Sequence, residues 1–181
     1  QEYFFIASEW RADIERAFAE FFGERAIREK LPVLKDEQEE GFFNEWFVYD
    51  FKLSNGRTPL EEFVETNPAF FSADSLNVYR DLLENEYGSW EVMDLRKEEG
   101  MTITNLLTGH TYDVLERSGT RNLSKGNLFF ARVGRVNGHW ELVGSNSFAF
   151  DVKVDQGFRD YIRKTTGGLN PKMVHEIYYS S

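Results

Sequence analysis

Residues 88–95 read GSWEVMDL, and they mark the point at which the chain changes from a helical to a β pattern. Before this stretch, apolar residues recur every three or four positions, which is the spacing of one helix face. Within it, Trp90 and Val92 are separated by a single residue, and this period of two is typical of a strand. The change of period predicts an α+β protein, with helices in residues 1–88 and strands in residues 89–181.

Four helix-start signals precede this change of period. Ser, Thr and Asp favour the position before a helix because their side-chain oxygens accept hydrogen bonds from the free N–H groups of the first turn. Such residues stand at Ser8, Asp36, Thr58 and Ser72. Glu39 and Glu61 follow two of them by three residues, which is the spacing of a capping box. We expect about four helices: the second, apolar on nearly every side, should be buried and end at 55–56, and the fourth should extend to about Tyr87.

The second half of the chain has the pattern of short strands joined by tight turns. Asn137 and Gly138 form a two-residue hairpin signal between two of these strands. The predicted strands are 90–95, 101–105, 110–116, 127–136, 139–143 and 148–154. They predict a small antiparallel β-barrel, SH3-like or OB-like, or a highly curled sheet.

The predicted organisation is therefore a helical subdomain followed by a β subdomain. The N-terminal cluster of helices occupies residues 1–88. The antiparallel β subdomain occupies residues 89–181 and includes a short C-terminal helix at 156–164. Because the junction near Gly88 is short, we expect the two to dock as one compact unit.

The composition excludes several classes of protein. The 181 residues include no cysteine, which rules out disulfides and thiolate metal ligands. Hydrophobic residues make up 41% of the chain, enough for a packed core, yet no run approaches the roughly 18 apolar residues of a membrane-spanning helix. We expect a soluble cytoplasmic protein with no membrane association. Because the chain does not begin with Met, we expect it to be either trimmed at its start or a fragment of a longer polypeptide.

The net charge of −10 is concentrated in the first half of the chain. Residues 1–88 contain 9 Lys and Arg against 20 Asp and Glu, whereas residues 89–181 contain 12 against 11. Long-range repulsion from the acidic half opposes association with nucleic acid or anionic lipid. A basic partner, or no partner, suits this half better.

Asp50 is a lone carboxylate in the aromatic second helix. If it were buried without a partner, its pKa would rise and it could act as a general acid. Arg57 follows shortly after the turn, and burial of an unpaired carboxylate costs several kcal/mol. We therefore predict that Asp50 and Arg57 form an ion pair, and we keep a catalytic role for the two as an alternative.

The other titratable residues show no spacing that indicates chemistry. His110, His139 and His175 are scattered, and the first two lie beside predicted turns, where exposed histidine is common. The acidic neighbours resemble the solvated faces of ordinary helices; they are Glu37, Glu39, Glu40, Glu61, Glu62, Glu84 and Glu86. No catalytic, cofactor-binding or metal-ligating residue is predicted.

A candidate nucleic-acid patch lies in the second half. Basic and aromatic side chains on a barrel surface are typical of proteins that bind single strands. The candidate residues are Arg117, Arg121, Lys125, Phe129 and Arg132. Arg135 follows Arg132 by three positions and so points to the opposite face of the strand, which weakens the patch.

Four segments resemble an uncharacterised bacterial family related to SEC-C-motif-associated proteins. They are WFVYDF at 46–51, GRTPLEEF at 56–63, NLLTG at 105–109 and GNLFFAR at 126–132. The resemblance covers about residues 40–145 and implies a helix–turn–helix followed by a β region. Some relatives carry the SEC-C zinc knuckle, whose cysteines this chain lacks, so the resemblance implies no zinc here.

The function that these observations favour is a non-catalytic binding or scaffold module that acts on a protein partner or on a second copy of itself. Aromatic residues, 16% of this chain, are enriched in the cores of protein interfaces. Binding of single-stranded nucleic acid by the β subdomain is the alternative, and an enzyme built around Asp50 and Arg57 is the third.

Overall fold

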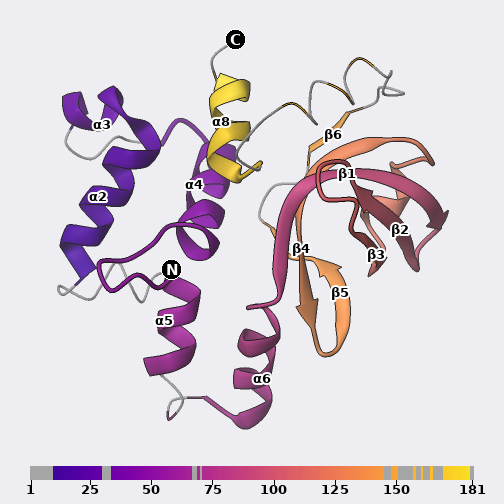
Figure 1. Ribbon diagram of the computed structural model, residues 1–181, viewed down its shortest axis with the longest axis horizontal. Coiled ribbons are helices and arrows are strands. Elements are labelled where there is room, and N and C mark those ends of the chain that lie inside the picture. Colours follow the sequence, from indigo (N-terminus) through magenta and orange to yellow (C-terminus); the bar gives the residue numbers. More distant parts are fainter. Residues whose placement is uncertain are drawn as a thin grey trace. The chain divides into compact units, whose positions relative to one another are not determined.

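The chain folds into two compact units, which the computed structural model in Figure 1 shows. Unit 1 comprises Gln1–Phe70 with Pro171–Ser181, and unit 2 comprises Phe71–Asn170. The structure describes residues 10–29, 34–66, 69, 71–144, 148–150, 157, 160, 164 and 169–179. The predicted α+β class is confirmed. The division differs from the predicted boundary near Gly88, because one helix before that point belongs to the sheet unit and the last helix belongs to the helical unit. Docking as one compact unit stays a prediction.

Unit 1 is helical throughout its regular structure. Its elements are α2 (Arg11–Phe22), α3 (Glu24–Glu29), α4 (Glu37–Tyr49), α5 (Pro59–Thr66) and α8 (Pro171–Tyr179). The helix predicted from Ser8 onward is divided at Gly23, whose φ of +54° lies in the left-handed region that favours glycine. Ser8 itself lies outside the described residues, and so does most of the helix predicted at 156–164. In Figure 1, α8 (yellow) lies beside α4, and contacts between the two helices join the end of the chain to its beginning.

Helix α4 forms the centre of unit 1. The Asp36 carboxylate accepts the backbone N–H of Glu39 at 2.8 Å, so the predicted cap is confirmed. The aromatic face is buried as expected, since Phe42 and Phe47 are fully buried and Trp46 is 3% exposed. The helix ends at Tyr49, earlier than predicted; the apolar residues beyond it are still buried, but in a loop.

Helix α5 begins with the predicted capping box. Thr58 Oγ1 accepts the N–H of Glu61 at 3.2 Å, and the Glu61 carboxylate accepts the N–H of Thr58 at 2.5 Å. The backbone bond from Thr58 is the main cause that holds the pKa of Glu61 below its usual range. Two of the N–H groups at this helix end are therefore paired.

The described elements of unit 2 are mainly a six-stranded sheet and the helix that precedes it. They are α6 (Ala73–Asp81), β1 (Asn85–Arg96), β2 (Gly100–Asn105), β3 (Thr111–Leu115), the 3₁₀ turn η2 (Gly119–Arg121), β4 (Leu128–Val136), β5 (His139–Leu142) and β6 (Phe148–Phe150). Ser72 caps α6 as predicted, by accepting the N–H of Ser75 at 3.2 Å. The prediction that this helix extends to Tyr87 was wrong, because Tyr87 pairs with Arg132 of β4 and already belongs to β1.

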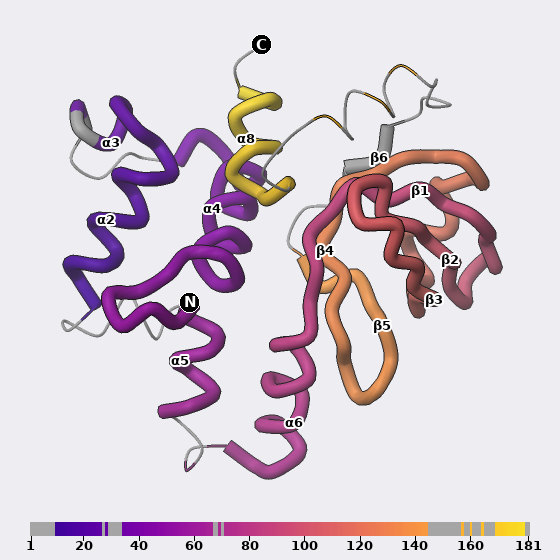
Figure 2. The backbone as a smooth tube through the Cα atoms, in the orientation of Figure 1, coloured from indigo at the N-terminus to yellow at the C-terminus, as the bar shows by residue number. Residues whose placement is uncertain are grey.

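The strand pairings of unit 2 form a closed cycle. Strand β1 pairs with β2, β2 with β3, β3 with β5, β5 with β4, and β4 again with β1. The sixth strand, β6, pairs with the start of β4 on the side away from β1. Figure 2 shows how β1 curves through the sheet so that its first half meets β4 and its second half meets β2. The β3–β5 pairing is parallel, which corrects the expectation of a purely antiparallel sheet. The curled sheet itself was expected.

The interior of this cycle is apolar. The buried cluster consists of Trp90, Val92, Met101, Ile103, Val114, Phe129, Ala131 and Val133. The indole N–H of Trp90 donates to the carbonyl of Ala131 at 2.8 Å, so its one polar atom is satisfied inside the core. The Asn137–Gly138 turn has φ of 50° and 82°, as the hairpin signal requires. Of the strand predicted at 148–154, residues 148–150 form β6, and the remainder lies outside the described residues.

Replacement of Trp46 by alanine tests the core of unit 1. Trp46 packs against Phe21 and Phe51, with ring centroids 5.3 and 5.2 Å away. Trp46→Ala should lower the free energy of unfolding by about 3–5 kcal/mol because it leaves a cavity. Chemical denaturation measures this change, and the exposed Glu40→Ala on the same helix is the control. Equal loss in the two variants would contradict the placement of Trp46.

Candidate functional site

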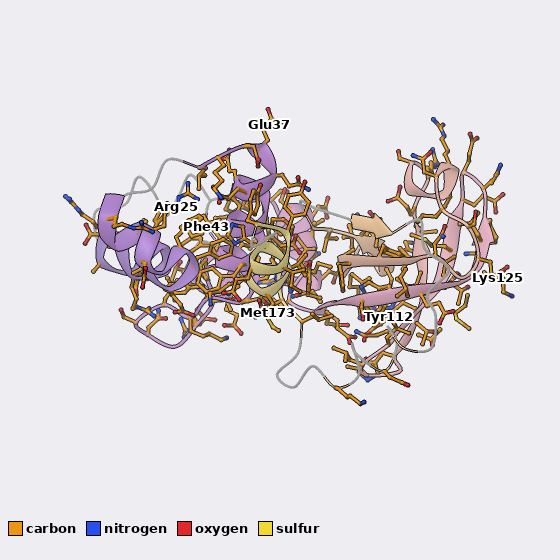
Figure 3. All side chains as sticks on the ribbon, turned by 90° about the horizontal axis from the view of Figure 1, so that it is seen from above. Arg25, Glu37, Phe43, Tyr112, Lys125 and Met173 are labelled. Carbon is orange, nitrogen blue, oxygen red and sulfur yellow. The ribbon has the colours of Figure 1, made fainter. Side chains whose placement is uncertain are left out.

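A pocket of about 400 Å³ opens on unit 1, within the size range of ligand sites. Helices α2, α3 and α8 and the start of α4 contribute its walls. The lining residues are Glu20, Phe21, Phe22, Gly23, Arg25, Lys35, Glu39, Lys172, His175, Glu176 and Tyr179. Figure 3 shows Arg25 at the edge of the tightly packed side chains around Phe43. The pocket thus combines aromatic walls with a few charged groups, which is typical of a binding site.

A buried carboxylate stands in the wall of this pocket. The side chain of Glu39 is fully buried, and it accepts hydrogen bonds from the Arg25 guanidinium at 2.6 Å, the backbone N–H of Lys35 at 2.7 Å and His175 Nε2 at 3.0 Å. Burial raises the pKa of the Glu39 carboxyl, but these three donors outweigh burial and hold the pKa below its usual range. Glu39 is therefore ionised at neutral pH.

His175 is the second unusual residue of the pocket. It is 8% exposed, and the rings of Phe21 and Tyr179 lie 4.8 Å from its centroid. Since the Glu39 carboxylate is ionised, Nε2 must carry the proton that it donates. Within the described part of the chain, the other ring nitrogen, Nδ1, is buried and has no hydrogen-bond partner. Buried polar atoms of this kind are few in folded proteins.

Tyr179 forms the outer side of the pocket. Its hydroxyl donates to Asp36 Oδ1 at 2.6 Å, and the Lys35 ammonium lies 4.7 Å above its ring. Burial and the Asp36 carboxylate raise the pKa of Tyr179, and the Tyr179 hydroxyl in turn is the main cause that lowers the pKa of Asp36. Two residues of α8, four positions apart, are thus tethered to the first turn of α4.

The expectation that Glu39 belongs to a solvated face was wrong. Its neighbours Glu37 and Glu40 are exposed as expected. Glu39 is buried because three donors converge on it: Lys35 from the segment just before its helix, and Arg25 and His175 from two other helices. The capping-box spacing was a signal that this carboxylate has a structural role. No sequence pattern indicated its pairing with His175, 136 residues away.

Removal of the Glu39 charge should destabilise unit 1 in a pH-dependent manner. The folded pKa lies below the unfolded one, so the contribution is complete above the unfolded pKa of about 4.3 and is lost as the pH falls through the folded pKa. Glu39→Gln should therefore cost about 3–5 kcal/mol at pH 7, because it leaves Arg25 and His175 without their carboxylate. The deficit should shrink below about pH 4.

Urea denaturation at pH 7 and at pH 3 measures this effect. Glu37→Gln, on the exposed side of the same helix turn, is the matched control and should change stability by less than about 0.5 kcal/mol. A deficit of Glu39→Gln that stayed constant with pH would contradict the assignment of the ionised carboxylate.

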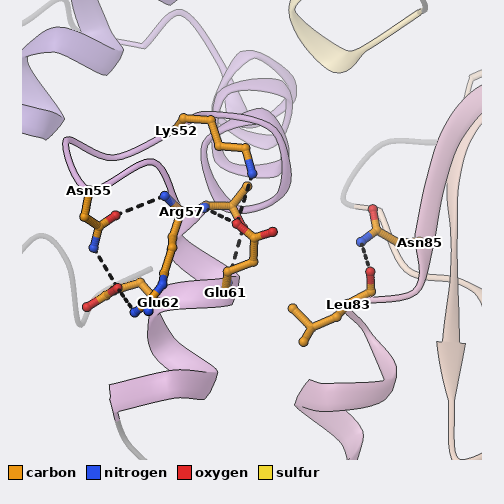
Figure 4. Close-up of polar contacts among 8 residues, drawn as sticks. Lys52, Asn55, Arg57, Glu61, Glu62, Leu83 and Asn85 are labelled. Carbon is orange, nitrogen blue, oxygen red and sulfur yellow. Dashed lines mark hydrogen bonds and ion pairs between the residues drawn. The ribbon is translucent and has the colours of Figure 1, made fainter.

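Asp50 and Arg57 lie at the end of α4 and in the loop that follows. Asp50 is the half-buried C-cap residue of α4. The Arg57 guanidinium lies 3.2 Å from the carboxylate of Glu62, which also accepts the Asn55 amide at 2.8 Å (Figure 4). The contact that the structure gives Arg57 is thus with Glu62, and coupling between Asp50 and Arg57 stays a prediction.

Two double-mutant cycles compare these partners. Because the Arg57 side chain is 47% exposed, the Arg57–Glu62 pair should have a coupling energy of about 0.2–1 kcal/mol. If Asp50 and Arg57 form the predicted ion pair, their cycle should give a coupling above about 1 kcal/mol. Free energies of unfolding for the alanine variants of all three residues provide both numbers, and a larger Asp50–Arg57 coupling would favour the original pairing.

The candidate nucleic-acid residues do not share one surface. Phe129 and Arg132 are each only 2% exposed; Phe129 belongs to the core, and Arg132 donates to Asn85 at 2.7 Å. Arg117, Arg121 and Lys125 are exposed, and Figure 3 shows Lys125 at an outer edge of unit 2. Arg121 pairs with Glu98 at 3.3 Å. The surface part of the predicted patch is therefore limited to the loop before β4.

The remaining histidines of the prediction lie in unit 2, at turns as expected. His110 is 63% exposed, and its Nδ1 lies 3.0 Å from the carboxylate of Glu86. Glu86 also accepts the hydroxyl of Tyr112 at 2.9 Å, and burial together with this carboxylate raises the pKa of Tyr112 to about 12. His139 is exposed at the start of β5. This cluster joins the β2–β3 hairpin to β1.

A second hollow, of about 550 Å³, lies on unit 2. It is lined by Glu98, Glu99, Leu115, Glu116, Arg117 and Glu141. With four carboxylates and one guanidinium, its field is negative. Across the described ranges, no group of three or more His, Asp or Glu residues is placed to hold a metal ion. No described helix is long and apolar enough to cross a membrane.

The two units together match one protein family. Residues 19–175 match a family of unknown function (DUF7986), and because this range covers most of the chain, the protein belongs to that family. No curated protein and no solved structure matches the chain. The expected relation to SEC-C-motif-associated proteins stays a prediction.

Proposed function

We propose that the protein is a non-catalytic binding module, and that unit 1 receives a segment of a basic protein partner in the pocket between α2, α3 and α8. The observation that carries this proposal is the pocket itself. Its walls are aromatic, and the buried carboxylate of Glu39 is hydrogen-bonded to His175 in the wall. The Glu39 carboxylate accepts hydrogen bonds from Arg25, Lys35 and His175. We therefore assign it a role in holding the walls of the pocket in place and not in reacting with a ligand.

The charge of unit 1 favours a basic partner. This unit contains 9 Lys and Arg against 17 Asp and Glu, so it carries −8 of the net charge of −10. Such a field accelerates the encounter with a cationic segment and repels nucleic acid. The Lys and Arg residues that line the pocket equal its Glu residues in number, and Lys172 pairs with Glu176 at 3.1 Å, so the negative field comes from unit 1 as a whole. Aromatic walls then suit a large apolar side chain from the same segment.

For unit 2 we propose an OB-like barrel that serves as a scaffold. The cycle β1–β2–β3–β5–β4, closed by β4–β1, is a five-stranded arrangement of the kind found in OB folds. Such folds bind oligonucleotides on β2 and β3 and the adjoining loops, but a fold alone does not define a function. Here this region has an acidic hollow at Glu98 and Glu99. A phosphate backbone is disfavoured there, so nucleic-acid binding is the weaker alternative.

Titration of the isotopically labelled full chain with capped pentapeptides tests the proposal. Lys-Lys-Tyr-Lys-Lys should shift the backbone resonances of α2 and α8 around the pocket, with an affinity that falls as salt is added. Glu-Glu-Tyr-Glu-Glu and Lys-Lys-Ala-Lys-Lys should bind more weakly. Tyr179→Ala removes an aromatic wall and should weaken binding about two- to tenfold, whereas Tyr178→Ala, its neighbour outside the pocket, should not.

Three outcomes would overturn the proposal. One is equal binding of the basic and acidic peptides, and another is a set of shifts that avoids the pocket. The third is tighter binding of a ten-residue oligothymidylate than of the basic peptide, with shifts in unit 2, which would support the nucleic-acid alternative.

A further inference from the structure

The imidazole of His175 limits the chemistry of the group that the pocket takes. His175 lines the pocket, and its Nδ1 is one of few buried polar side-chain atoms in the described residues that lack a hydrogen-bond partner. Nε2 donates to the Glu39 carboxylate, so a neutral ring presents Nδ1 as a bare acceptor. A buried acceptor without a donor costs stability, which a ligand restores if it supplies an N–H or O–H.

We infer that the group bound in this pocket is an aromatic ring that carries a hydrogen-bond donor, as in Tyr or Trp, and that its donor pairs with His175 Nδ1. This inference rests on the proposed function of the pocket and names the chemistry of its occupant. The rings of Phe21 and Phe22, 4.8 and 5.9 Å from the imidazole, provide the aromatic contacts. A charged group is less suited, because the walls already pair their charges at Glu39 and at Glu176.

In the inferred binding mode, the ligand reaches Nδ1 past Tyr179, whose ring centroid lies 4.8 Å from that of the imidazole. The rings of Phe21, Phe22 and Phe42 around the imidazole are buried, whereas Tyr179 is half-buried and ends α8. Its hydroxyl is held by Asp36 at 2.6 Å, a surface group. In the inferred binding mode, a small displacement of the Tyr179 ring at the helix end exposes the imidazole edge. The incoming ring then lies beside His175, and the Tyr179 ring stays in contact with it as an aromatic wall.

Two small probes of matched shape test the inference on the full chain. p-Cresol carries a hydroxyl donor, and 4-methylanisole has the same ring with a methyl ether that cannot donate. p-Cresol should bind about two- to tenfold more tightly, since one hydrogen bond separates the two probes. The imidazole nitrogen resonances provide a second readout: the Nδ1 resonance of His175 should shift when p-cresol, but not 4-methylanisole, is added.

His175→Phe should remove the preference for p-cresol while it preserves the aromatic wall. If this variant fails to fold because Glu39 loses a donor, the nitrogen resonances of the wild-type protein still decide the question. Equal affinities of the two probes with an unchanged Nδ1 resonance would overturn the donor inference and leave the pocket proposal intact. Absence of pocket shifts with both probes and with the basic peptide would overturn both.

Discussion

The carboxylate of Glu39 is the point on which the architecture of unit 1 depends. A fully buried charge is tolerated in a protein only if several donors surround it. Here the donors come from α3, from the segment before α4 and from α8, so these three parts must converge on one position. The aromatic side chains of α2 and α4 fill the space around this cluster and keep water out of it. Loss of the carboxylate therefore affects the docking of helices as well as one ion pair.

The same cluster explains why the end of the chain belongs to the N-terminal unit. Asp36 and Glu39 form the first turn of α4, and each also accepts a hydrogen bond from α8, through Tyr179 and His175. A helix start thus serves as the docking point for a helix from the far end of the sequence. This arrangement also creates the pocket, because the two tethers hold α8 beside α2 with aromatic side chains in between.

The two units differ in what they offer a partner. Unit 1 carries most of the negative charge and a pocket with one unpaired acceptor, whereas the hollow of unit 2 has carboxylates around an exposed Leu115. Arg132 belongs to the predicted nucleic-acid patch but lies inside unit 2. It donates a hydrogen bond to Asn85, and its guanidinium lies 5.3 Å from the ring centroid of Tyr87. A basic protein segment therefore suits the pocket of unit 1 and the hollow of unit 2, whereas a polyanion such as nucleic acid suits neither.

Features that depend on near neighbours could be predicted from the sequence. Capping at Asp36, Thr58 and Ser72, the hairpin at Asn137–Gly138 and the change from helix to strand all follow from residues within a few positions of one another. Burial of the most apolar helix was predictable for the same reason, since aromatic residues dominate its sequence after the first turn.

Tertiary structure decided the features that depend on residues far apart. In the sequence, residues 85–87 continue the helical pattern of the residues before them. In the structure, their backbone pairs with β4, and they form the start of β1. Glu39 resembled its exposed neighbours, and it is buried because Arg25 and His175 reach it from other helices. Arg132 resembled a surface cation, and it is buried because Asn85 and Tyr87 on the adjacent strand receive it. The burial of a charge depends on whether partners compensate its desolvation, and the positions of those partners are set by the fold.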